Sequence, residues 1–470
     1  MKSDPVHGLS GSPPSVRARA FWLAALGLVT AGGLVFCLAV IPPWQSPDEP
    51  THFEFAALLA RGGLSLHPRP DRALQEEIIV SLDRYEFWRF AGIPRPQPLP
   101  RTFISSPFLC QAHTQIGKNL PGYYLLAAFV LKLCPWETLI GEMYWLRGLN
   151  AIFAFLTVGA VFLCARKVFG GGFYPALAAA GFTAALPQFA VIGTSVSPDP
   201  LTNLLGALFI LLALSDRGEK RRALPLIFPV LLLGLFTSYK FLILLGAYLL
   251  ARVAALIRPP VDGGRRSVFA ALAIEAALLF LVYCALLWFA PRLVGIFLGR
   301  IRMLAVVLAG FLAGTSVHPP GYWRWFGAML FKSFWLYFGW LRYPAPTAVY
   351  GAWGGLAALS LFGAAARLLG GIAGEKETRA APYRRLAVLA IFAGTVLAAY
   401  YVFWGLRVAY TTTQGRHLFL AIPAWAALFV WGMTGLFPSR WRDPVCRAIF
   451  LIMPILASVA FIGSVWMVYH

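Results

Sequence analysis

The sequence predicts an all-α polytopic membrane protein, and its composition, its apolar runs and the placement of its cations carry that prediction. Of 470 residues, 59% are hydrophobic and only 13% are charged, and the mean hydropathy is +0.70. A soluble globular chain normally carries about 25% charged residues. These values exclude a disordered chain, a collagen-like chain and an ordinary soluble enzyme, and they favour one continuous membrane domain.

The net charge of the chain is +21, from 40 Lys and Arg against 19 Asp and Glu. In a soluble protein such an excess would indicate a nucleic-acid partner. Here the cations lie in loops between apolar runs, so orientation in the membrane and contact with anionic lipids account for them. We therefore expect the lipid bilayer, and no nucleic acid, as a partner.

Eleven segments are long and apolar enough, or nearly so, to cross a bilayer, which takes about 20 residues. They are 20–41, 142–165, 173–193, 200–214, 223–239, 241–257, 268–290, 347–366, 386–406, 418–437 and 448–468. The first is too long for a signal peptide and lacks a small-residue cleavage site, which predicts an uncleaved anchor. Residues 1–19 are then a cytoplasmic tail, and residues 20–470 form a single transmembrane domain.

Three further apolar stretches, 120–135, 303–315 and 325–341, affect the topology. If 120–135 does not cross, the cytoplasmic loops after residue 150 hold eighteen Lys and Arg, whereas the short outer loops hold only Lys240, Arg407 and Arg416. The positive-inside rule therefore favours 120–135 as a membrane-dipping helix within a long outer loop, 42–141. The other two stretches fall in a second outer segment, 291–346. If both cross, the count becomes thirteen and the orientation is unchanged.

The first outer loop has an organisation of its own. An amphipathic juxtamembrane helix is predicted over 71–90, with Leu74, Ile78, Leu82, Tyr85 and Trp88 on one face. A proline-rich extended strip follows at 93–100. Cys110 and Cys134 lie in the same loop, and both a disulfide and two unrelated thiols remain open. Long ordered loops in compact proteins usually have a function.

The most informative motif, residues 46–52, lies just after the first span. Ser46 as N-cap with Glu49 three residues later fits a capping box, which assigns both residues a structural role. Asp48 and His52 are four residues apart and share one helix face. An anionic carboxylate at a helix start suits a general base or, with His52, half of a divalent-metal site. The alternative is an ordinary capped and solvated helix start.

Two further motifs are predicted on the same side of the membrane. Asp199, in an outer turn, is either a turn residue or part of a site that it shares with Asp48. Arg416, which follows Gly415, and Lys240 lie at outer helix ends. Their side chains either bind a lipid-linked phosphate or extend to ordinary headgroups. An aromatic run, 333–340, fits an interfacial belt or a surface on which a sugar or a polyprenyl chain packs.

In this order the motifs resemble those of the GT-C superfamily of membrane glycosyltransferases. They are more similar still to a bacterial "domain of unknown function" family of integral membrane proteins with P-D-E-x-x-H and Q-G-R-Y motifs. The resemblance spans residues 41 to about 420. Its carriers are Pro47-Asp48-Glu49 with His52, Leu120–Tyr124, Pro198-Asp199, Ser333–Trp335, Phe338–Trp340 and Gln414–Arg416.

The resemblance implies a GT-C-like fold and a sugar donor on a polyprenyl phosphate that enters from the bilayer. A glycan, lipid or protein acceptor would approach from outside the plasma (inner) membrane, in cell-envelope glycan or glycolipid assembly. It assigns Asp48 as base or metal ligand and Asp199 as the second acidic residue. The chain departs from the pattern at His417, where the family usually has Tyr, and at Gly117-Lys118, where aminoarabinose transferases have Glu-Lys.

The leading hypothesis is therefore an inverting glycosyltransferase with Asp48, Asp199 and His52 as catalytic candidates. Arg416, with Lys240 and Lys118, would stabilise the departing lipid phosphate. One alternative is a lipid or polysaccharide transporter, which predicts charged residues at mid-membrane and inverted repeats. A non-enzymatic scaffold of an envelope polysaccharide system is another, and it assigns no role to Asp48 or Asp199.

Overall fold

The computed structural model describes residues 14–62, 68–103, 119–215, 224–257, 291–314, 318–374, 380–406 and 413–469, and single helical positions between 273 and 288. Lys118 and Cys110 lie outside the described residues, so the phosphate-binding role predicted for Lys118 and the pairing of Cys110 with Cys134 do too. The same holds for residues 1–13 of the predicted cytoplasmic tail and for most of the predicted span 268–290.

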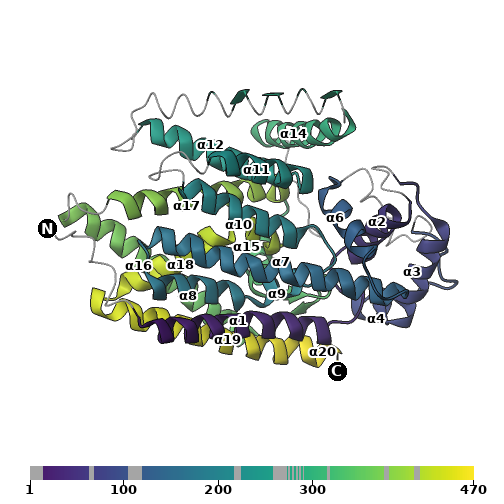
Figure 1. The fold of residues 1–470 in the computed structure, drawn as a ribbon, viewed down its shortest axis with the longest axis horizontal. Helices are drawn as coiled ribbons and strands as arrows, with labels where there is room; N and C mark the ends of the chain where they lie inside the picture. The colour runs from purple at the N-terminus through teal and green to yellow at the C-terminus, as the bar shows by residue number, and fades with distance from the viewer. Residues whose placement is uncertain are drawn as a thin grey trace.

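Helices that lie side by side form the body of the protein (Figure 1). In chain order they are α1 (Val16–Val40), α7 (Leu139–Val168), α8 (Phe173–Ala184), α9 (Pro187–Gly193), α10 (Asp199–Ser215), α11 (Leu224–Thr237), α12 (Phe241–Ile257), α14 (Pro291–Leu312), α16 (Thr347–Gly374), α17 (Ala380–Tyr400), α18 (Ile422–Met433) and α19 (Arg442–Ala460). The main packing partners are α7 with α8 and α10, α8 with α19, and α16 with α18.

Seven described helices are long and apolar enough to cross a membrane, and the bent pair α8–α9 would make eight. The seven begin at Val16, Leu139, Val294, Thr347, Tyr383, Gly415 and Ser439. The predicted spans 200–214, 223–239 and 241–257 fall on the shorter apolar helices α10, α11 and α12, of 17, 14 and 17 residues. The structure is therefore a multi-helix membrane fold, and the count of eleven or thirteen stays a prediction.

The segment predicted as the first outer loop forms a compact helical lobe at one end of the helix bundle, which we call the outer lobe after that prediction (Figure 1). It contains α2 (Glu49–Arg61), α3 (Arg72–Arg84), α4 (Phe87–Ala91) and α6 (Gly122–Leu131). The segment predicted as one helix over 71–90 is helical, but a turn at Glu86 (φ 52°) divides it into α3 and α4. Its apolar face is buried, with Leu74, Ile78 and Leu82 at most 1% exposed.

Two of the three ambiguous stretches do not form long helices. The 120–135 stretch forms α6, of 10 residues, which is about 15 Å long at 1.5 Å per residue, against the ~30 Å of a hydrocarbon core. The 325–341 stretch is broken, because α15 (Tyr322–Trp335) ends before a short antiparallel pair, β1 (Tyr337–Phe338) and β2 (Tyr343–Pro344). Only the 303–315 stretch lies on a helix of spanning length, α14.

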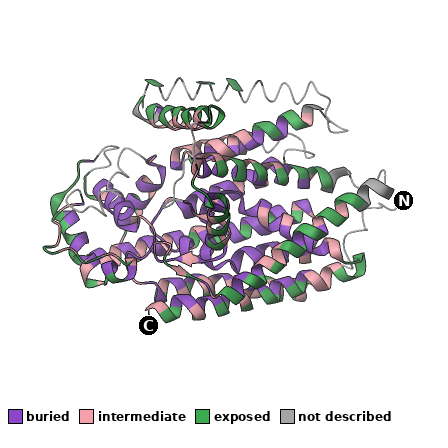
Figure 2. Ribbon diagram, turned by 180° about the vertical axis from the view of Figure 1, so that it is seen from behind, coloured by how far each residue is buried: buried purple, intermediate pink, exposed green. Residues whose placement is uncertain are grey.

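Two large clusters of buried apolar side chains form the core. One joins the outer lobe to α7, α10, α12 and α17, and the other joins α1, α8, α16, α18 and α19. Many large apolar side chains of α1, α7, α14, α16 and α19 are exposed, as expected for helices that face lipid. Figure 2 shows exposed positions along these helices. The segment that connects α1 to α2 carries Asp48, and the segment that connects α9 to α10 leads directly into Asp199, the first residue of α10.

Candidate active site

Asp48 stands at the beginning of α2, where the chain turns from the end of α1 into the outer lobe. Its backbone is in the left-handed region (φ 59°), a conformation that Asp tolerates better than most residues. Its carbonyl oxygen accepts hydrogen bonds from His52 N at 3.0 Å and Thr51 Oγ1 at 2.9 Å. The helix therefore begins without using the Asp48 carboxylate, which is 36% exposed.

Four charged side chains from four separate turns meet at this point. Arg416 lies between two carboxylates, with its Nη2 3.8 Å from Asp48 Oδ2 and its Nη1 3.8 Å from Asp199 Oδ2. Lys240 Nζ lies 2.5 Å from the other oxygen of Asp199. Signs alternate along the row, so its formal charge is zero. We call Asp48, Arg416, Asp199 and Lys240 the four-charge row; the sequence predicted all four as site residues.

Arg416 is held in place by a close approach between two motifs. Arg416 lies in the 3₁₀ helix η3 (Gly415–Ala421), and Gly415 N donates a hydrogen bond to Ser333 Oγ on α15 at 2.7 Å. A Cβ on Gly415 would stand 2.3 Å from Phe334 N and 2.6 Å from Leu330 O. Glycine is therefore required here, because a side chain would push η3 away from α15. This contact joins the predicted Ser333–Trp335 and Gln414–Arg416 motifs.

Arg416 is 91% buried and incompletely satisfied within the described part of the chain. Its relative exposure is 9%, and its Nε has no hydrogen-bond partner there. The adjacent His417 stacks on Trp404 with ring centroids 5.9 Å apart, and its Nδ1 likewise has no partner among the described residues. The two 3.8 Å separations exceed the 2.7–3.2 Å of an N–H···O hydrogen bond. The guanidinium group thus retains donors that can bind an anion.

His52 lies one turn along α2 from Asp48 and is buried, with its Nδ1 2.7 Å from the Tyr124 hydroxyl. Burial lowers the pKa of His52 to about 4, and the Asp48 carboxylate, which favours the imidazolium, opposes this shift. His52 is therefore neutral at neutral pH. It links the start of α2 to α6, whose Tyr124 also stacks on Phe55.

The divalent-metal site predicted for Asp48 and His52 stays a prediction. Nδ1 of His52 is engaged by Tyr124, which leaves Nε2 as its metal-binding nitrogen, and both oxygens of Asp199 already face cations. Among the described residues, no group of three or more His, Cys, Asp and Glu could hold a metal ion. Lys240 and Arg416 supply the positive charge beside the carboxylates, and no step below uses a metal.

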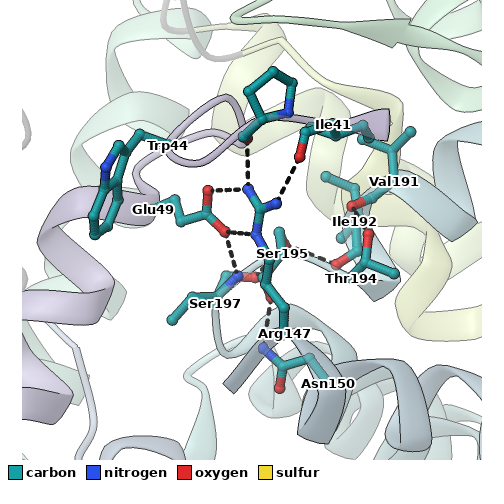
Figure 3. A network of polar contacts seen from close by, with 12 residues as sticks. Ile41, Trp44, Glu49, Arg147, Asn150, Val191, Ile192, Thr194, Ser195 and Ser197 are labelled. Carbon is teal, nitrogen blue, oxygen red and sulfur yellow. Dashed lines mark hydrogen bonds and ion pairs between the residues drawn. The ribbon is translucent and has the colours of Figure 1, made fainter. Parts of the chain in front are cut away.

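The capping box predicted for Ser46 and Glu49 is wrong. Helix α2 begins at Glu49 with Asp48 at the N-cap position, and no side chain caps it. Ser46 contributes only a backbone carbonyl, which accepts from Glu49 N at 3.3 Å. The Glu49 side chain instead accepts two hydrogen bonds from Arg147 on α7, at 2.9 and 2.7 Å (Figure 3). A guanidinium group is a stronger partner for a carboxylate than a backbone amide.

Sequence reasoning missed Arg147. It lies inside the predicted span 142–165, and a cation in an apolar run is a recognised signal of function or of a buried partner. Tyr124, which contacts His52, was predicted only as part of the Leu120–Tyr124 motif. No pattern in the sequence pairs either residue with its partner, because each contact joins segments far apart in the chain.

Comparisons with known proteins address the fold and the family of the chain. No curated protein matches it. Among solved structures, the oligosaccharyltransferase of Archaeoglobus fulgidus in its apo form matches with a TM-score of 0.51 and 12% identity, over 97% of this chain and 56% of that one. The chain thus spans little more than half of that protein. ArnT from Cupriavidus metallidurans matches with a TM-score of 0.48 in its apo state (12% identity, 96% and 77% coverage) and 0.42 when bound to undecaprenyl phosphate (13%, 97% and 76%).

The oligosaccharyltransferase is a GT-C glycosyltransferase, and at 12% identity its match shows the fold alone. The GT-C likeness expected from the motifs is thereby confirmed at the level of architecture. A family model described as "Predicted membrane protein (DUF2142)" matches residues 33–425, a range that contains every member of the four-charge row. The chain therefore belongs to the DUF2142 family of predicted membrane proteins.

Proposed function

We propose that the protein is a glycosyltransferase that uses a polyprenyl-phosphate sugar at the outer face of the plasma membrane. It would act in the assembly of cell-envelope glycans or glycolipids. One observation carries the proposal: Arg416 lies between two carboxylates, 3.8 Å from each, and Lys240 stands on the far side of Asp199. The fold shared with an oligosaccharyltransferase supports the same class of reaction.

Arg416 and Lys240 are suited to the phosphate of the donor. A guanidinium group presents paired N–H donors that match phosphate oxygens, and an ammonium group adds a point charge. Burial of Arg416 strengthens such a contact, since water screens it less.

The two carboxylates are expected to have different roles. Asp199 is 11% exposed and contacts both cations, so it holds Lys240 and Arg416 in place. The Asp48 carboxylate is 36% exposed and faces only Arg416 among the described cations, so an acceptor hydroxyl can reach it. Asp48 is therefore the proposed general base.

The reaction is a single displacement. Asp48 takes the proton of the acceptor hydroxyl, and the acceptor oxygen forms a bond to the anomeric carbon of the sugar. The bond between that carbon and the phosphate oxygen breaks, and its electron pair leaves with the polyprenyl phosphate. Arg416 and Lys240 stabilise the charge that develops on the leaving phosphate. Attack opposite to the leaving group inverts the anomeric configuration.

The proposal is tested with the purified full-length protein and a panel of polyprenyl-phosphate sugars. An envelope extract serves as the source of glycan, lipid or protein acceptors, and mass spectrometry measures the polyprenyl phosphate released. We expect one donor to be cleaved in an extract-dependent manner. If no donor is cleaved and the protein instead moves an intact lipid-linked sugar across vesicles, the protein is a transporter and the proposal fails.

A further inference from the structure

A buried ion pair outside the four-charge row joins the chain segments that carry its two carboxylates. Arg147 Nε and Nη2 donate to the two oxygens of Glu49 at 2.9 and 2.7 Å (Figure 3). Glu49 is 0% exposed and Arg147 is 1% exposed. A buried pair is weak evidence for stability by itself, because well-packed apolar side chains in its place are often as stable. The role of the pair is therefore inferred from the chain segments that it joins and not from its contribution to stability.

The remaining donors and acceptors of the pair reach two other segments. Arg147 Nη1 and Nη2 donate to the carbonyl oxygens of Ile41 and Pro42, at 2.8 and 3.0 Å, just after α1. Glu49 Oε1 also accepts from Val196 N at 3.0 Å, in the turn between α9 and α10. The pair thus fixes the end of α1, the start of α2 and the 194–198 turn to a single point on α7.

A second side chain of α7 supports the same turn. Asn150, one helical turn after Arg147, donates to the Ser195 carbonyl oxygen at 2.6 Å and to the Tyr123 hydroxyl at 2.9 Å. Asn150 is fully buried. The peptide group between Ser195 and Val196 is therefore held at both ends. Asn150 binds its carbonyl oxygen, and Glu49 binds its N–H.

We propose that the Glu49–Arg147 pair is a positioning device for the reaction proposed above, on which this inference rests. Asp48 directly precedes Glu49, and Asp199 follows Val196 by three residues, so the pair sets the spacing of the two carboxylates on either side of Arg416. Neither Glu49 nor Arg147 touches the reacting atoms. Misplacement of a catalytic group by about 1 Å can cost roughly 100-fold in rate.

The experiment separates positioning from stability with a double substitution. Glu49→Gln alone leaves a buried unpaired guanidinium group, and we expect a lower thermal midpoint and low activity. Glu49→Gln with Arg147→Met removes both charges, and the new amide oxygen can still accept from Val196 N. We expect the double variant to recover most of the thermal midpoint in detergent, while kcat stays about 100-fold below wild type.

The matched control removes another ion pair between the same two helices. Arg61 at the end of α2 contacts Glu142 on α7 at 3.2 Å, and Arg61 is 44% exposed. Arg61→Met with Glu142→Gln should keep near-normal kcat. If the Glu49→Gln/Arg147→Met variant recovers kcat together with its thermal midpoint, the pair is structural only and the inference fails.

A second readout does not depend on glycosyl transfer. Hydrogen exchange of the folded double variant should accelerate in residues 46–51 and 194–199 and stay unchanged in α3. If wild type transfers no sugar, the proposed function fails, and the exchange measurement still decides whether the pair holds the two carboxylate-bearing segments in place. Unchanged exchange in both segments would overturn the inference.

Discussion

Arg416 and Lys240 contact the same carboxylate and differ in what they can offer a ligand. Lys240 lies 2.5 Å from Asp199 and is fixed to it, whereas Arg416 stands 3.8 Å from each of two carboxylates. Arg416 is also the less exposed of the two, at 9% against 18% for Lys240. In the proposed reaction, Arg416 is therefore the main candidate for binding the donor phosphate.

The substitution Arg416→Lys should weaken donor binding although it keeps the charge. Lysine lacks the planar pair of donors, and a charge-assisted contact of this kind is worth about 1.5–3 kcal/mol, or roughly a ten- to hundredfold change in affinity. A donor-lipid titration measures the change. The control is Arg324→Lys, on the exposed surface of α15. Equal, near-normal affinities for the two variants would make Arg416 an ordinary interfacial residue.

Glu54 on α2 gives the outer lobe a pH-dependent stability. Its carboxyl group is 2% exposed and accepts a hydrogen bond from Gln75 on α3, whose own side-chain oxygen accepts from Phe103 N at 3.1 Å. Burial raises the pKa of Glu54 from 4.5 to about 7, and the hydrogen bond from Gln75 opposes this shift. The folded protein therefore binds a proton between about pH 4.5 and 7 that the unfolded chain has released.

Since the folded state binds the extra proton, the contribution of Glu54 to stability falls as pH rises from about 4.5 to 7 and is constant above. Glu54→Gln keeps the acceptor for Gln75 and removes the charge. We expect the free energy of unfolding of the variant to be close to that of wild type at pH 5. At pH 8 it should be higher by roughly 3 kcal/mol, because each pKa unit corresponds to about 1.4 kcal/mol. Thermal unfolding in detergent at both pH values measures this difference. If the variant and wild type differ in stability by the same amount at both pH values, Glu54 is ionised in the folded protein.

At the scale of elements, the contact between α15 and η3 determines where Arg416 lies. Gly415→Ala would force apart two backbones, and overpacking of this kind typically costs about 1–3 kcal/mol. We expect a lower thermal midpoint and weaker donor binding in this variant. Gly394→Ala on α17, where a Cβ meets nothing within 4 Å, is the control and should be neutral or stabilising. If the two variants have the same thermal midpoint and donor affinity, the contact between α15 and η3 does not position Arg416.

Apolar runs and helical periodicity predicted most elements but not their interruptions. The amphipathic pattern at 71–90 and the long runs of α1, α7 and α19 are strong local signals. The aromatic stretch 325–341 is equally apolar, yet it bends at residues 339–341, whose φ angles are all positive. Hydropathy does not distinguish a broken apolar segment from a spanning one, because both consist of the same residue types.

The sequence predicted which residues belong to the candidate site, but it did not predict which of them contact each other. Asp48, Asp199, Lys240 and Arg416 stood out because charges are rare in a chain this apolar. Glu49 was misassigned, because a Ser followed three residues later by a Glu is the capping pattern whether or not a buried arginine lies nearby. Its partner Arg147 is about 100 residues away in the sequence.

At the scale of the whole molecule, the four-charge row brings together four turns at one end of the bundle. They are the turns after α1, between α9 and α10, between α11 and α12, and before α18. The topology predicted from the positive-inside rule places all four turns on the same side of the membrane, and in the structure they lie together. That topology also requires that the 120–135 stretch does not cross the membrane, and α6 is too short to do so. Which side of the membrane this end faces stays a prediction from charge.

Labelling of single cysteines tests that orientation. Ala73→Cys in the outer lobe and Ser439→Cys between α18 and α19 are both at exposed positions. On a cysteine-free background, a membrane-impermeant thiol reagent should label Ala73→Cys in intact cells and Ser439→Cys only after permeabilisation. Labelling of Ser439→Cys in intact cells would reverse the orientation and place the four-charge row inside.

The central claim is that Asp48 is the base of a glycosyl transfer at the four-charge row. The most direct measurement is the rate of polyprenyl-phosphate release by purified Asp48→Asn, which keeps the shape of the side chain and removes its charge. Loss of a positioned base typically lowers the rate by about 10²–10⁴-fold, and we expect a decrease in this range. Glu76→Gln, an exposed acid of the same lobe, should turn over at the wild-type rate. A folded Asp48→Asn protein with turnover close to wild type would contradict the account.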